Sequence, residues 1–253
     1  MTTFAVRLAD LPPDHPGRRL LTGYSPAFAA RSDPRFSYTV FVPEDLRDGE
    51  RPRLWVCVHG TRRRTKLYLD GLAGLARAER AVVLTPLFPA GISAPDDIDD
   101  YKFLEHAGIR FDRVLLGMVD EVAHRWNADA SAFFLHGFSG GGQFAHRFLY
   151  RHPERLTAVS IGAPGRISLP DGETPGAITR VPVQLVIGSL DTDPAAITWM
   201  PGEGGADRMS RARTLAGALR EFGADVRFDV VDGVGHDGAG VLPAVIGFLL
   251  ASQ

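Results

Sequence analysis

Short apolar runs along this chain alternate with longer segments whose apolar residues recur at helical spacing. Runs rich in β-branched and aromatic residues predict buried strands, which we expect at 36–42, 53–59, 81–85, 132–135, 156–161, 183–187 and 226–231. Apolar positions three or four residues apart predict helices at 67–80, 109–126, 143–150, 208–222 and 241–251. Strands that alternate with helices favour an α/β fold, with a mostly parallel central sheet flanked by helices on both faces.

The segments outside this alternation are polar. Residues 1–34 are rich in Pro, Gly and Arg and predict an extended lead-in to a single domain that spans 1–253. We expect a hairpin-like connection at 44–53 and a long loop at 86–108. The interval 162–182 is short and rich in Gly and Pro, so we expect a loop there.

Composition and charge narrow the class of protein. Hydrophobic residues make up 45% of the chain, charged residues 23%, and the formal net charge is −2, which argues against a nucleic-acid partner or an anionic membrane surface. Cys57 is the one cysteine, so no intrachain disulfide can form, and its apolar strand predicts a buried thiol. The N-terminus does not look like a secretory signal, and no apolar stretch is long enough to span a membrane, so we expect a cytoplasmic protein. The sequence makes no prediction of oligomeric state.

The most specific chemical signal is the G-x-S-x-G motif Gly137-Phe138-Ser139-Gly140-Gly141, between a predicted strand and a predicted helix. A serine on so sharp a turn has a strained backbone and needs small neighbours, which the glycines supply. The helix that follows directs its free N–H groups and its positive dipole end toward the serine. In this context the motif resembles the nucleophile elbow of the α/β-hydrolase superfamily. The resemblance implies the α/β-hydrolase fold, with Ser139 as the nucleophile. This superfamily often carries a helical cap at the position of 162–182, and this interval is too short for one, so we expect no large cap domain and an open cleft roofed by loops.

An acid and a histidine follow the serine in the order that this superfamily uses. A serine hydroxyl needs a base to take its proton and a third group to hold that base. Asp191 follows a predicted buried strand in a G-x-x-D pattern, and ligands in open α/β folds bind at this end of the strands. Asp193, two residues later, is the alternative acid. His236 follows the last predicted strand. The resemblance therefore implies a catalytic triad of Ser139, His236 and Asp191.

The resemblance also implies an oxyanion hole made of two backbone N–H groups. Gly140, directly after the serine, supplies one of them. The pair His59-Gly60 marks the other turn in the family, although an HGGG run is missing here, and either Thr61 or Arg62 supplies the second N–H. Acyl transfer at such a site needs no metal ion or organic cofactor, and no Cys/His cluster predicts a metal site.

The substrate pocket is less clearly marked. The segment 125–129 resembles the R-W-x-x-D lead-in of polyhydroxybutyrate depolymerase-like and feruloyl-esterase-like enzymes, which implies a carboxylester hydrolase acting on a small-molecule ester. Arg62 begins a run of three arginines and is either a contact for a carboxylate-bearing substrate or part of a solvated surface. Phe138, Phe88 and Trp199 either form an apolar pocket or pack elsewhere.

Two other functions are compatible with the same motifs. One is a peptidase or amidase of the prolyl-oligopeptidase-like type, which usually carries an extra domain that this chain has no room for. The other is a non-catalytic binding protein related to the α/β-hydrolases, which often lacks a member of the triad, whereas all three are present here. The sequence therefore favours a serine carboxylester hydrolase that forms an acyl-enzyme on Ser139.

Overall fold

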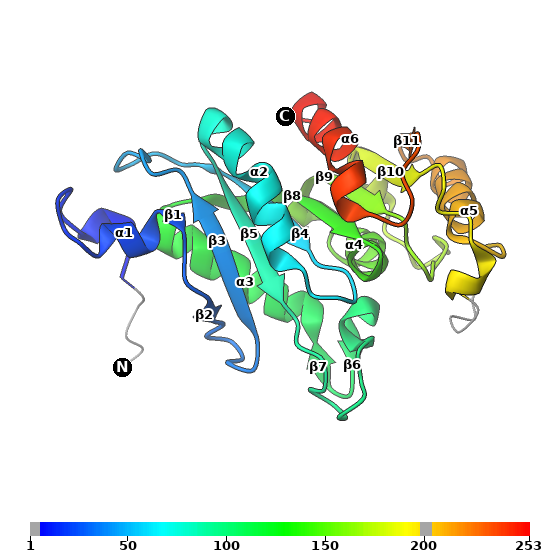
Figure 1. The fold of residues 1–253 in the computed structure, drawn as a ribbon, viewed down its shortest axis with the longest axis horizontal. Coiled ribbons are helices and arrows are strands. Elements are labelled where there is room, and N and C mark those ends of the chain that lie inside the picture. Colours follow the sequence, from blue (N-terminus) through cyan, green and yellow to red (C-terminus); the bar gives the residue numbers. More distant parts are fainter. Residues whose placement is uncertain (1–5, 198–203) are drawn as a thin grey trace.

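A computed structural model describes residues 6–197 and 204–253 (Figure 1). The strands are β1 Gly23–Tyr24, β2 Phe28–Ala29, β3 Ser37–Val42, β4 Arg53–Val58, β5 Ala81–Leu87, β6 Glu105–His106, β7 Ile109–Arg110, β8 Asp129–Phe138, β9 Leu156–Gly162, β10 Val183–Gly188 and β11 Val226–Val231. The main sheet has the order β1-β3-β5-β4-β8-β9-β10-β11, with β2 also paired to β3. The strands from β5 to β11 in this order run parallel, while β3 is antiparallel to β5 and to β1 and β2. The expected mostly parallel sheet is confirmed.

Helices cover both faces of this sheet. The α-helices are α1 Arg18–Leu21, α2 Thr65–Glu79, α3 Phe111–Trp126, α4 Gly140–Arg151, α5 Arg208–Glu221 and α6 Gly238–Ala251, and the 3-10 helices are η1 Leu8–Asp10, η2 Asp100–Phe103, η3 Pro153–Arg155, η4 Gly176–Arg180 and η5 Pro194–Ile197. Side chains alternate along β4, so that Val56 packs in the core layer under α3 and α4, and Trp55 packs in the layer under α2 and α6. Figure 1 shows α2 and α6 on one side of the sheet. Cys57 is buried in this second layer, as expected, and burial raises the pKa of its thiol.

Two connections differ from the expectation. The segment 44–53 is not a hairpin, because β5 lies between β3 and β4 in the sheet and the chain crosses from one to the other. Within the lead-in, the short strands β1 and β2 pair with β3, and Leu8 and Leu21 are buried in the main core. These local apolar contacts are too short to give a periodic signal in the sequence.

The long helices begin and end close to the expected residues. Helix α6 starts three residues earlier than the expected 241, because the Asp237 carboxylate accepts hydrogen bonds from the N–H groups of Ala239 and Gly240 at 3.1 and 3.2 Å. Helix α3 ends where Asn127 takes a left-handed conformation. Among the described residues, no helix combines the length and the apolar character needed to cross a membrane.

Candidate active site

A sharp turn joins β8 to α4, with Ser139 at its apex. Ser139 has φ 59° and ψ −114°, a conformation that non-glycine residues rarely adopt. A Cβ atom at Gly137 would lie 2.1 Å from the carbonyl oxygen of Gly141, and one at Gly141 would lie 2.2 Å from that of Val58. The chain can make this turn only because both positions lack a side chain.

The side chains of Ser139, His236 and Asp191 form a continuous series of hydrogen bonds. Nδ1 of His236 lies 2.6 Å from Oδ2 of Asp191, and Nε2 of the same ring lies 2.9 Å from Oγ of Ser139. An ionised carboxylate only accepts hydrogen bonds, so Nδ1 carries the proton. The free lone pair of neutral His236 is then on Nε2, where it accepts the hydroxyl proton of Ser139. This arrangement can deprotonate the serine during nucleophilic attack.

The turns after β10 and β11 bring the acid and the histidine together. The N–H of Leu190 donates to the carbonyl oxygen of Val234 at 2.9 Å, and the N–H of Gly233 donates to Oγ of Ser189 at 2.9 Å. Two adjacent parallel strands therefore end in turns that are bonded to each other.

Asp191, and not Asp193, is the acid that reaches His236. Asp191 is buried and accepts the imidazole proton, whereas Asp193 is exposed and accepts a hydrogen bond from the N–H of Ala195 at 2.9 Å. The structure therefore distinguishes the two candidates that the sequence left open.

Arg208 is a buried partner of Asp191 that the sequence did not single out. Its Nη1 donates to Oδ1 of Asp191 at 3.1 Å, while Oδ2 of the same carboxylate bonds to His236. Its Nη2 also donates to the carbonyl oxygen of Ala196 at 3.2 Å. Arg208 is the first residue of α5, and no local pattern marks an ion pair between residues 17 positions apart in the sequence.

Two backbone amides lie side by side next to the serine. Gly140 is the first residue of α4, and a Cβ built on it would lie 3.2 Å from the amide nitrogen of Thr61. Neither N–H group has a hydrogen-bond partner within 6–197 or 204–253. Of the two candidates for the second donor, the Thr61 amide is thus the one beside Gly140.

Two residues of the 3-10 helix η2, Tyr101 and Lys102, lie close to Gly140. A Cβ on Gly140 would meet the Tyr101 hydroxyl at 2.4 Å and Cε of Lys102 at 2.8 Å. The Tyr101 hydroxyl donates to the carbonyl oxygen of His59 at 3.0 Å, and burial raises the pKa of Tyr101. Burial lowers the pKa of Lys102, whose ammonium is paired with Asp99.

Two buried histidines support the strands on which the site is built. Nδ1–H of His59 donates to the carbonyl oxygen of Gly60 at 2.9 Å, and its Nε2 accepts from the N–H of Phe88 at 3.0 Å. His136 bonds to Oγ of Ser160 at 3.0 Å. Burial lowers the pKa of both His59 and His136 to about 4, so both rings are neutral at pH 7.

An open cavity of about 430 Å³ lies over Ser139. Its lining comprises Gly60, Thr61, Arg62, Arg64, Leu67, Tyr68, Phe138, Ser139, Gln143, Arg208, His236, Asp237 and Gly238. The expected pocket residues Arg62 and Phe138 are among them. The centroid of the Phe138 ring lies 4.9 Å from the centroid of the His236 ring.

The expectation that Phe88 lines the pocket needs correction, and Trp199 lies outside the described residues. Phe88 is completely buried in the core, stacked 5.6 Å from Phe144 and 5.5 Å from Tyr101. It follows β5 directly, and the sequence does not distinguish a ring that turns into the core from one that turns into a cleft.

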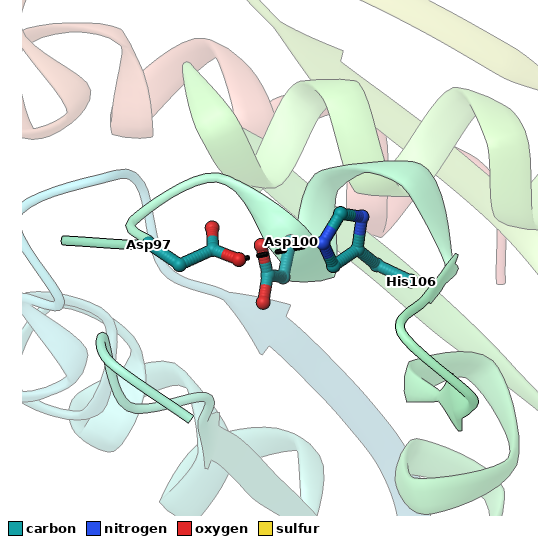
Figure 2. Close-up of side chains that lie close together, drawn as sticks. All are labelled: Asp97, Asp100 and His106. Carbon is teal, nitrogen blue, oxygen red and sulfur yellow. Dashed lines mark ion pairs between the residues drawn. The ribbon is translucent and has the colours of Figure 1, made fainter. Parts of the chain in front are cut away.

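Asp97, Asp100 and His106 form a second group of titratable side chains on the 86–108 loop. Figure 2 shows them pointing toward one another, with Nε2 of His106 3.4 Å from Oδ2 of Asp97 and 3.6 Å from Oδ1 of Asp100. Burial and the neighbouring Asp97 carboxylate raise the pKa of Asp100. In the described part of the chain, these are the side chains whose ligand atoms are close enough to hold a metal ion, all within 4.8 Å. They pair with one another and are not part of the lining of the cavity over Ser139.

Comparison with solved structures shows the fold. The chain is similar to a poly(3-hydroxybutyrate) depolymerase from Bordetella parapertussis, with 20% identity and a TM-score of 0.70 over 86% of this chain and 84% of that one. It is also similar to poly(aspartic acid) hydrolase-1 from Sphingomonas sp. KT-1, with 18% identity and a TM-score of 0.69 over 85% of this chain and 93% of that one. A third similar structure is a ferulic acid esterase, with 15% identity and a TM-score of 0.64 over 91% of this chain and 97% of that one. No family model and no curated protein matches the sequence. The chain has the α/β-hydrolase fold, as the elbow motif implied.

Proposed function

We propose that this protein is a serine hydrolase that cleaves carboxylic esters through an acyl-enzyme on Ser139. The observation that carries the proposal is the unbroken series of hydrogen bonds from Asp191 through His236 to Ser139, at the base of an open cavity. Solved structures that share the fold are named as a depolymerase of a polyester and as esterases, which agrees with ester chemistry.

In the proposed reaction, Oγ of Ser139 attacks the ester carbonyl while Nε2 of His236 takes the hydroxyl proton. Asp191 keeps the proton of Nδ1 in place and stabilises the imidazolium that forms. The amides of Gly140 and Thr61 donate to the oxyanion, and each well-placed donor lowers the barrier by about 3–4 kcal/mol. The imidazolium of His236 then protonates the departing alcohol, which leaves the acyl group bound to Oγ of Ser139. In the second step, His236 takes a proton from water, and the water oxygen attacks the acyl carbonyl. The imidazolium returns the proton to Oγ of Ser139 as the acid is released.

Replacement of the nucleophile tests the proposal most directly. Ser139→Ala removes the attacking oxygen, so we expect turnover of p-nitrophenyl butyrate to fall by roughly 10⁶. Wild-type protein is expected to react with a fluorophosphonate probe at Ser139, and the variant is expected not to react. Unlabelled wild-type protein with no turnover would instead indicate a binding protein, and faster cleavage of matched p-nitroanilides than of esters would indicate an amidase.

The two neighbouring acids provide a matched pair of variants. Asp191→Asn retains the shape of the side chain and removes the charge beside His236, so kcat is expected to fall by about 10⁴. Asp193→Asn makes the same change on an exposed side chain that lacks contact with the histidine, and we expect it to retain most of the activity. Equal losses in both variants would contradict the assigned acid.

A further inference from the structure

Three consecutive arginines, Arg62, Arg63 and Arg64, follow the turn after β4, and the middle one is not part of the cavity lining. Nε, Nη1 and Nη2 of Arg63 donate to the carbonyl oxygens of Phe88, Thr61 and Ile98 at 3.1, 2.6 and 2.8 Å. Its guanidinium also lies over the Tyr101 ring. Arg63 therefore ties this turn to the segment that follows β5, and it is not part of the cavity lining.

Its two neighbours, Arg62 and Arg64, are exposed and line the cavity over Ser139. The side chains of both arginines lack an ion pair or hydrogen bond to any described residue. The other charges of the lining are already engaged. Asp237 caps α6 through both carboxylate oxygens, and Arg208 is paired with Asp191. Two positive charges that lack an ion-pair partner among the described residues thus line the cavity of a chain whose net charge is −2.

The start of helix α2 adds to this positive field. Arg64 is the N-cap residue of α2, its side chain accepts no hydrogen bond from the first turn, and that turn holds no acidic residue. Cations at the positive end of a helix dipole are unfavourable, whereas an anion bound there is stabilised. A bound carboxylate would compensate both the helix end and the two guanidinium groups.

We propose that the site hydrolyses esters that carry a second, ionised carboxylate, which Arg62 and Arg64 bind. This inference rests on the proposed function of Ser139. Guanidinium groups bind carboxylates through paired N–H donors, which matches the chemistry of the two free side chains. Leu67, Tyr68 and Phe138 line the same cavity and provide apolar contact for the carbon chain between the ester and the carboxylate.

Pairs of esters that differ only in a terminal carboxylate test the proposal, with acid release followed at constant pH. Monoethyl glutarate and ethyl pentanoate place the difference on the acyl side, and 4-acetoxybutanoate and butyl acetate place it on the alcohol side. We expect wild-type protein to have a kcat/KM at least about tenfold higher for the anionic member of one pair, and the preference is expected to shrink in 0.5 M NaCl. The pair that shows the preference identifies the side of the ester that carries the carboxylate.

Variants then connect the preference to the two arginines. In Arg62→Gln and Arg64→Gln, the ratio of kcat/KM for the anionic ester to that for its neutral match is expected to fall about tenfold. The ratio cancels any loss of folded protein. Arg31→Gln removes an equal charge from an exposed residue outside the cavity lining, and its ratio is expected to match wild type.

Three results would overturn the inference while leaving the proposed function intact. The first is hydrolysis of neutral esters with no preference for the anionic member of either pair. The second is a preference for the anionic ester that survives in the Arg62→Gln/Arg64→Gln double variant. The third is an equal fall of the kcat/KM ratio in Arg31→Gln. A wild-type protein that hydrolyses none of the four esters and does not react with fluorophosphonate would instead overturn the proposed function.

Discussion

The close approach of β10 to the loop that carries His236 makes Gly188 a sensitive test of the site geometry. Gly188 is the last residue of β10, and its carbonyl oxygen accepts the N–H of Asp191 at 3.1 Å. A Cβ at Gly188 would lie 2.1 Å from the carbonyl oxygen of Val234 and 2.6 Å from that of Gly235, and contacts under 3.0 Å are essentially never seen. Both carbonyl oxygens belong to the backbone, so in Gly188→Ala the loop that carries His236 has to retreat by about 1 Å.

The expected loss follows from this displacement. His236 lies 2.9 Å from Ser139, so a shift of about 1 Å breaks the hydrogen bond that activates the serine. A misplacement of about 1 Å lowers enzyme activity by roughly 10². Overpacking of this kind destabilises a fold by about 1–3 kcal/mol, which for a chain of this size lowers Tm by about 2–4 °C per kcal/mol.

Gly235→Ala is the matched control, because a Cβ at Gly235 has no atom within 4 Å although the residue precedes His236. Ester hydrolysis and the rate of fluorophosphonate labelling report on the site, and thermal unfolding reports on the fold. We expect a large loss in Gly188→Ala and a small one in Gly235→Ala. Wild-type activity and Tm in Gly188→Ala would refute the steric reasoning, and equal damage in both variants would show that the loop tolerates no added methyl group.

Two further predictions concern buried ionisable side chains. Arg208→Gln leaves Oδ1 of buried Asp191 without its cationic partner, so we expect the free energy of unfolding to fall by about 3–5 kcal/mol and kcat to decrease. We expect Arg208→Lys to recover part of the lost kcat. An unchanged kcat in Arg208→Gln would contradict a positioning role for Arg208. Because the pKa values of His59 and His136 are lowered to about 4, the unfolded chain binds protons below about pH 6.5 that the folded chain does not bind. Stability is therefore fully present above pH 6.5 and falls as the pH drops toward 4, by up to about 3 kcal/mol per pH unit near pH 5, and urea unfolding at pH 7.5, 6 and 5 measures it. A constant unfolding midpoint over this range would show that the two rings are not held neutral.

The parts of the site that depend on local steric constraints could be predicted from the sequence. The spacing of Gly137, Ser139 and Gly141 allows one kind of turn, because side chains at the glycine positions would collide with backbone atoms. The order of Asp191 and His236 after two apolar strands is also informative, since adjacent parallel strands end at the same edge of the sheet.

The parts that depend on contacts distant in sequence could not be predicted in this way. The pairing of Arg208 with Asp191 is determined by how α5 packs beside the turn after β10, and the sequence gives no signal for it. Phe88 shows the same limit, because its burial depends on rings from several other elements. The connection at 44–53 was wrongly expected to be a hairpin, because its polar composition suits a crossing connection equally well.

The two edges of the main sheet have features that disfavour pairing with strands of other molecules. At one end, β1 and β2 each cover β3 over only two residues, so they offer a very short row of free backbone groups to a strand from another molecule. At the other end, β11 carries the charged pair Arg227 and Asp229. Short edges and charged edge residues both disfavour the strand-to-strand contacts from which aggregates grow. Both features lower the tendency of the sheet edges to recruit further copies by β-pairing.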